Sequence, residues 1–171
     1  MSDRGERDGT TLTSATRFDE EVLAAIAAGA AEAYPHEGCG ALLGPGPGTF
    51  PRHVTLALPV PNTKSCRQRD RFEVAPRDYI GVEDEADRRG LALLGFWHSH
   101  PDGEARPSRT DRAWAWEGLL TVIVAVEARL PHGVGAWEIL APDAPFTPVV
   151  IEVESAAGPA RVTTLAGRAG A

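Results

Sequence analysis

The sequence predicts a layered α/β or α+β domain, and three observations support this prediction. Segments rich in helix formers alternate along the chain with short apolar segments of strand length. Clusters of Gly and Pro separate these segments. With 171 residues, 43% of them hydrophobic, the chain is long enough to bury the core of one domain. We expect this domain over residues 16–154, between a disordered polar leader (1–15) and a flexible tail rich in Ala, Gly and Thr (155–171).

Three helices are predicted. The first is expected over 18–34, because it is rich in alanine, has acidic residues in its first turn and is stopped by Pro35. The second is expected over 76–89, where a proline suits the first position and Gly90 suits the end. The third is expected over 109–120, after a loop of Pro, Gly and Ser.

The strands are predicted from apolar segments bounded by turn residues. Residues 91–98 are almost wholly apolar, as expected for a central strand that is buried on both faces. Residues 53–60 alternate loosely between apolar and polar. Further strands are expected at 39–44, at 121–126 and 136–140 with a turn around 131–133, and at 149–153.

Composition limits the classes of partner. The net charge is −7, and no cluster of Lys and Arg is present to neutralise phosphates, which argues against binding to nucleic acid or an anionic membrane. The two cysteines, Cys39 and Cys66, do not form a CxxC pair, so a thiolate zinc site is excluded. Cys39 is best interpreted as a small buried residue. We find no signal-peptide pattern and no apolar stretch near 18 residues, and we therefore expect a cytoplasmic protein.

The most informative segment is 95–111, which contains His98-Ser99-His100-Pro101 and, further on, Ser108 and Asp111. Residues i and i+2 of a strand point to the same face, so both imidazoles can reach one cation if they end the central strand. Asp111 needs only a loop to return to them. Two imidazoles and one carboxylate are typical of a catalytic zinc site whose fourth position is left for water. The alternative is a pair of solvated loop histidines.

Two further polar groups have both a structural and a chemical interpretation. Ser108 and Asp111 have the spacing of a capping box at a helix N-terminus. Such a cap would also fix Asp111 and present the Ser108 hydroxyl to a developing oxyanion. Glu37, between the first predicted helix and strand, is the candidate general base, although its spacing alone favours a solvated loop acid.

Together, these segments resemble the JAMM metalloproteases of bacterial type, also called MPN+ or JAB domains. That family has a glutamate near the first strand, then His-x-His-Pro and Ser-x-x-Asp, and this chain has each element. The resemblance implies a curled mixed β-sheet flanked by helices, the cytidine-deaminase-like MPN architecture. It implies one zinc ion bound by His98, His100 and Asp111, Glu37 as general acid and base, and Ser108 as donor to the oxyanion.

The resemblance also implies a function. Small bacterial JAMM proteins resemble zinc metallopeptidases or isopeptidases that cut the amide bond after the C-terminal Gly-Gly of a ubiquitin-like or sulfur-carrier protein. We therefore expect such a protein as the substrate, and we expect this chain to be a monomer or a homodimer. Asn62 and Phe72 fall in a stretch that often lines the family's substrate groove, although core packing is the preferred interpretation for Phe72.

Other functions are kept as alternatives or set aside. A non-catalytic MPN-like scaffold and a deconjugating enzyme of a bacterial ubiquitin-like defence pathway are the alternatives. A zinc deaminase is disfavoured because its His-x-Glu and Pro-Cys-x-x-Cys signature is absent. A zincin is excluded because the chain has no His-Glu-x-x-His.

Overall fold

The computed structural model describes residues 14–64, 69–155 and 158–162 of the chain. The predicted leader lies outside the described residues except for its last two positions, and so do Cys66 and most of the predicted tail. Among the residues described, no helix has the length and apolar character that crossing a membrane requires.

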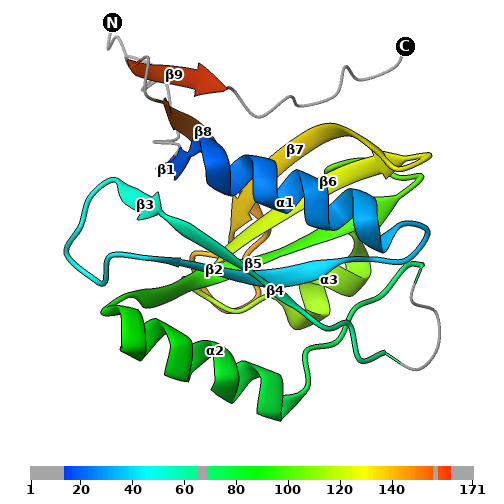
Figure 1. Cartoon of the computed structure of the whole chain (residues 1–171), viewed down its shortest axis with the longest axis horizontal. Coiled ribbons are helices and arrows are strands. Elements are labelled where there is room, and N and C mark those ends of the chain that lie inside the picture. Colours follow the sequence, from blue (N-terminus) through cyan, green and yellow to red (C-terminus); the bar gives the residue numbers. More distant parts are fainter. Residues whose placement is uncertain (1–13, 65–68, 156–157, 163–171) are drawn as a thin grey trace, which may run out of the picture.

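A nine-stranded mixed sheet is the centre of the fold and curls nearly into a barrel (Figure 1). Its strand order is β3-β1-β8-β7-β6-β5-β2-β4, with β9 beside β8. Three strand pairs, β1–β3, β1–β8 and β5–β6, are parallel, and the other pairs are antiparallel. The strands are β1 (Ala15–Asp19), β2 (Cys39–Gly44), β3 (Arg52–Val54), β4 (Leu56–Val60), β5 (Ala92–Pro101), β6 (Leu120–Glu127), β7 (Leu130–Glu138), β8 (Thr147–Ser155) and β9 (Gly158–Val162).

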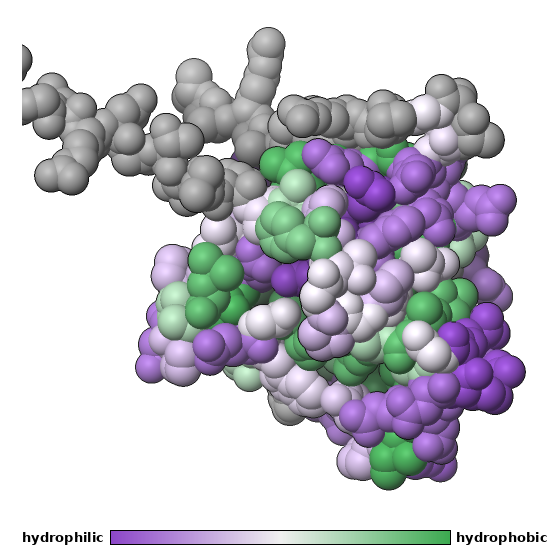
Figure 2. Space-filling view, turned by 90° about the vertical axis from the view of Figure 1, so that its left-hand side faces the viewer, coloured by the Kyte–Doolittle hydropathy of each residue, from purple (hydrophilic) through white to green (hydrophobic). Residues whose placement is uncertain are grey.

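Helices cover the sheet on both faces, which confirms the predicted α+β class (Figure 1). They are α1 (Glu20–Ala33), α2 (Pro76–Arg89) and α3 (Arg109–Trp114). Side chains of β5 alternate between the two faces, as its period of two requires: Trp97 packs in the core beneath α1, and Phe96 packs against the core beneath α2. On the side of the molecule turned to the viewer in Figure 2, hydrophobic residues lie in small groups between hydrophilic ones.

Several predicted elements are confirmed with small changes of length. The second helix begins at Pro76 and ends at Arg89, and Gly90 caps it in the left-handed conformation with a φ of 65°. The predicted central strand is β5, between β2 and β6. The single strand expected at 53–60 is two strands, because β3 pairs with β1 whereas β4 pairs with β2.

Three expectations differ from the structure. The chain enters α1 through β1, because Phe18 is fully buried and pairs with strands far away in sequence. The third helix ends at Trp114 rather than at residue 120, and Trp116 packs against the rings of Tyr79 and Phe96. Within the predicted tail, residues 158–162 form β9.

The hairpin between β6 and β7 also turns at an unexpected place. The turn residues are Ala128 and Arg129, with φ values of 49° and 67°, and not the Pro-His-Gly stretch at 131–133. A two-residue hairpin turn of this kind needs positive φ at both positions, for which Asn and Gly are the usual residues. The sequence therefore carries no turn signal at this position.

Candidate metal centre

The end of β5 brings together the predicted ligands His98, His100 and Asp111. The two imidazoles point to the same face of the strand, and their Nε2 atoms lie 3.1 Å apart. Asp111, in the first turn of α3, places Oδ1 3.1 Å from His98 Nε2 and Oδ2 3.3 Å from His100 Nε2. The three side chains thus converge on one point, as the sequence predicted.

These distances fit a zinc ion. Tetrahedral zinc with ligand bonds of about 2.0–2.1 Å holds neighbouring ligand atoms about 3.3 Å apart. The two imidazole nitrogens lie 3.1 Å apart, and each has an Asp111 oxygen within 3.3 Å, which is close to this spacing. Two imidazole nitrogens and a carboxylate oxygen are also the donors that zinc prefers at catalytic sites.

A capping box fixes Asp111. Ser108 is the N-cap of α3, and its hydroxyl accepts a hydrogen bond from the Asp111 amide at 3.2 Å. In return, the Ser108 amide donates to Asp111 Oδ2 at 2.5 Å. The capping interpretation is confirmed, and it does not exclude the chemical one. Accepting one bond leaves the Ser108 O–H able to donate.

Different contacts fix the orientation of the two imidazoles. His100 Nδ1 lies 2.8 Å from the Glu104 carbonyl oxygen, which must accept the proton, so Nε2 carries the lone pair toward the other ligands. The buried Nδ1 of His98 has no hydrogen-bond partner among the residues described. Phe72 stacks on the His98 ring instead, with 4.7 Å between ring centroids. Packing therefore orients His98.

The charges of the site depend on its burial. Burial alone would raise the pKa of Asp111, but its close contacts with the His100 and His98 rings outweigh burial and hold this pKa well below the ordinary value. Burial lowers the pKa of His98. For His100, burial opposes protonation, yet the contact with Asp111 raises its pKa overall.

Glu37 is buried beside the three ligands rather than solvated. It lies between α1 and β2, is 4% exposed, and its Oε2 has no hydrogen-bond partner within the described part of the chain. Burial raises the pKa of its carboxyl to about 8, although the charge of His100 opposes this shift. A buried carboxyl with a raised pKa, close to His100 and Asp111, suits acid–base chemistry.

Sequence reasoning did not single out Ser99, which ties Glu37 to the histidines. Its hydroxyl accepts from the Gly38 amide at 2.9 Å, and its own amide donates to the Gly38 carbonyl at 2.9 Å. Ser99 is buried and points to the face opposite His98 and His100. A serine inside an otherwise apolar strand was the signal that could have identified it.

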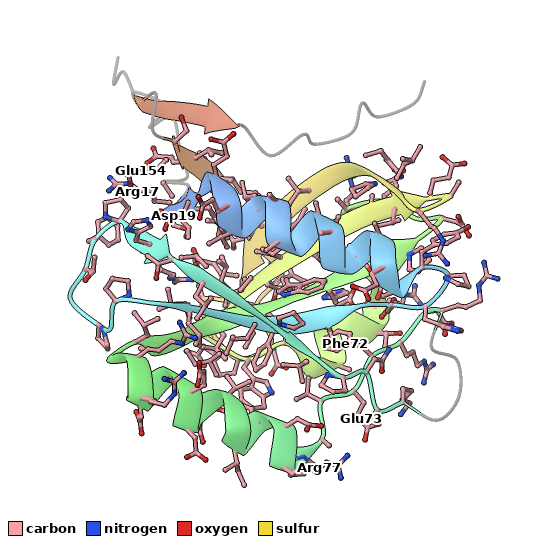
Figure 3. The ribbon with its side chains drawn as sticks, in the orientation of Figure 1. Arg17, Asp19, Phe72, Glu73, Arg77 and Glu154 are labelled. Atoms are coloured by element: carbon pink, nitrogen blue, oxygen red, sulfur yellow. The ribbon has the colours of Figure 1, made fainter. Side chains whose placement is uncertain are left out.

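A largely apolar cavity of about 430 Å³ adjoins two of the three predicted ligands. His98 and Asp111 form part of its wall, and Phe72 lies both in this wall and on the His98 ring. Figure 3 shows Phe72 in the segment that precedes α2. The other lining residues are Glu73, Val74, Pro76, Tyr79, Ile80, Phe96, Ala115, Trp116, Leu119, Leu120 and Thr121.

Two other groups of reactive residues have a structural explanation. Asp19, His53 and Glu154 lie close together at the β1 end of the sheet. His53 is 2.7 Å from Asp19. Arg17 pairs with Glu154 at 3.4 Å, and Figure 3 labels both beside Asp19. Cys39 is buried, contacts the Val60 carbonyl and has its pKa raised to about 12 by burial, which makes it a poor nucleophile.

Comparisons with known proteins identify the family and the fold. Residues 19–140 match the family described as prokaryotic homologs of the JAB domain. A protein named desampylase from Haloferax volcanii is 32% identical over 120 residues, which cover 70% of this chain and 84% of that protein. A solution structure from Salinibacter ruber has a TM-score of 0.65 at 32% identity, covering 86% of this chain and 97% of that one. A JAB1/MPN domain protein from Archaeoglobus fulgidus, 17% identical over 81% of this chain and 98% of its own, shares the fold with a TM-score of 0.51.

Proposed function

This chain belongs to the prokaryotic JAB family, and from this premise we propose that it is a zinc-dependent isopeptidase. Its proposed reaction is hydrolysis of the amide bond after the C-terminal Gly-Gly of a ubiquitin-like modifier. The observation that carries the proposal is the buried Glu37 carboxyl beside the converging side chains of His98, His100 and Asp111. The likeness to a desampylase supports a deconjugating activity.

The proposed ligands of zinc are His98, His100 and Asp111. When bound, zinc would supply a Lewis acid that polarises a carbonyl group and makes water more acidic. Glu37 accepts a proton from the attacking water and returns it to the departing nitrogen. The Ser108 hydroxyl donates a hydrogen bond to the carbonyl oxygen as negative charge develops on it.

Burial gives a reason to prefer an enzyme over a non-catalytic scaffold. A carboxyl without a hydrogen-bond partner costs stability when it is buried, by about 1–3 kcal/mol for a polar group. Glu37 has such a carboxyl oxygen. A scaffold gains nothing from this arrangement, whereas a general base needs an unshared carboxylate oxygen to accept a proton.

The apolar cavity is the proposed binding site for the C-terminal segment of the modifier. It reaches the metal ligands at His98 and Asp111, so a chain lying in it would end at the reacting groups. A Gly-Gly end is slim enough to approach them, and apolar side chains upstream would contact the aromatic wall formed by residues such as Phe72 and Trp116.

The test is cleavage of a ubiquitin-like protein, ending in Gly-Gly, that is joined by an isopeptide bond to a lysine of a carrier protein. The zinc-loaded chain should release the carrier, and Glu37→Gln should bind zinc but lose turnover. Glu127→Gln, a control at an exposed glutamate, should cleave like the wild type. A Glu37→Gln variant as active as the wild type would remove Glu37 from the mechanism. Zinc binding without cleavage by the wild type would favour the scaffold.

A further inference from the structure

The side chain of Asn62, just after β4, uses its whole hydrogen-bonding capacity in four bonds to the backbone. Its Nδ2 donates to the carbonyl oxygens of Glu37 at 3.0 Å and Arg71 at 3.1 Å. Its Oδ1 accepts from the amides of Lys64 and Glu73, each at 3.1 Å. Only a carboxamide offers two N–H donors and an acceptor in so small a group, since an aspartate at this position would have no donor.

These bonds join two segments that both lie at the metal centre. One bond holds the residue that carries the proposed general base, Glu37. Two others hold the peptide groups on both sides of Phe72, namely the Arg71 carbonyl and the Glu73 amide. Phe72 in turn stacks on His98, whose buried Nδ1 has no hydrogen-bond partner in the described residues.

The loop after β4 has bonds of its own that do not involve Asn62. The amide and the hydroxyl of Thr63 both donate to the Glu73 carbonyl, at 2.9 and 3.0 Å. Lys64 Nζ pairs with the Glu73 carboxylate at 2.9 Å. Thr63 and Lys64 therefore also stabilise the closed loop. The bond from Asn62 to the Glu37 carbonyl differs because it connects the loop to the site.

We propose that Asn62 is a positioning residue, which holds the Glu37 segment and the Phe72 segment in place beside the metal centre. It does not touch the reacting atoms. It acts on turnover through Glu37, and on the orientation of His98 through Phe72. The effect on turnover rests on the proposed hydrolase function, but the effect on His98 does not.

The first experiment measures zinc affinity by competition with a chelating dye and needs no substrate. Asn62→Ala and Phe72→Ala should each weaken zinc binding about 10-fold, as the loss of a group that orients a ligand does. The double variant should bind no more weakly than the weaker single variant. Thr63→Val, a control in the same loop, should bind like the wild type. Wild-type affinity in Asn62→Ala, or multiplied losses in the double variant, would overturn the proposal.

The second experiment uses the isopeptide substrate described above. Asn62→Ala should lower kcat by about 10- to 100-fold, because small misplacement of a reacting group is costly. On the slow residual rate of the Glu37→Gln background, measured at high enzyme concentration, the same substitution should cost less than about 3-fold, since Asn62 acts through Glu37. An equal loss in both backgrounds would contradict the inference, because it would indicate a general structural effect.

The two experiments also separate this inference from the proposed function. If the wild type cleaves nothing, the isopeptidase proposal fails and the zinc measurements alone decide the role of Asn62. Thermal unfolding identifies variants that do not fold. If Asn62→Ala is one of them, Asn62→Asp takes its place, because it keeps the size and the two accepted bonds but removes both donors.

Discussion

Gly40, in β2, lies against Trp97 and the opposite strand so closely that we expect no larger residue to fit. A Cβ atom at this position would lie 2.3 Å from the Leu58 carbonyl oxygen and 2.3 Å from Trp97 Nε1. The carbonyl belongs to the paired strand β4, and Trp97 is 2% exposed, so neither group can move away freely. Forcing extra atoms into such a packed core costs about 1–3 kcal/mol.

Gly81 offers a matched control for Gly40→Ala. It lies within α2, and a Cβ there would meet no atom within 4 Å. Gly81→Ala should stabilise the protein by about 0.5–1 kcal/mol, because alanine is the better helix former. The two variants should therefore differ by about 1.5–4 kcal/mol, which corresponds to about 3–16 °C in Tm for a domain of this size.

The assay is urea unfolding followed by tryptophan fluorescence, with thermal unfolding as the second measurement. Gly40→Ala should unfold at lower urea concentration than the wild type, with an unchanged dependence of the free energy on urea. If Gly40→Ala proved as stable as Gly81→Ala, the close contact of β2 and β4 with Trp97 would be refuted. The packing around Trp97, the residue before His98 in β5, would be refuted with it.

Two further predictions concern the site itself, and a third concerns the buried Cys39. His98→Ala and Asp111→Asn should each lose most of the bound zinc, measured by elemental analysis after gel filtration, and full zinc content in either variant would exclude that residue as a ligand. Ser108→Ala should lower kcat about 10²-fold through the lost oxyanion donor and stability by about 1 kcal/mol through the lost cap. An unchanged kcat would leave Ser108 only its capping role. In a Cys66→Ser background, Cys39 should resist iodoacetamide at pH 8 until the protein unfolds, because a pKa of about 12 leaves almost no thiolate at that pH. Rapid labelling of the folded protein would contradict its burial.

Local patterns allowed the ligands to be predicted. The alternation of side chains along a strand places His98 and His100 on one face whatever surrounds them. The capping box needs only Ser108, Asp111 and a helix start between them. Both patterns span only a few residues, so they can be identified without knowledge of the tertiary structure.

Elements that depend on distant partners could not be predicted in the same way. β1 forms because it pairs in parallel with β3 and β8, which follow it by more than thirty and more than a hundred residues. The third helix stops early because Trp116 gains aromatic contacts with Tyr79 and Phe96. Propensity and periodicity report only neighbouring residues, and they carry no information about such contacts.

The sequence by itself determined the class of fold and the three side chains that converge at the end of β5. Only the tertiary structure decided that Glu37 is buried among them, because the antiparallel pairing of β2 with β5 sets Cys39 opposite His98 and brings the preceding residues to the site. The role proposed for Asn62 depends in the same way on hydrogen bonds across the fold. The three predicted ligands follow from the spacing of residues that are close in the sequence. The buried environment of Glu37 follows from pairing between strands that are distant in the sequence.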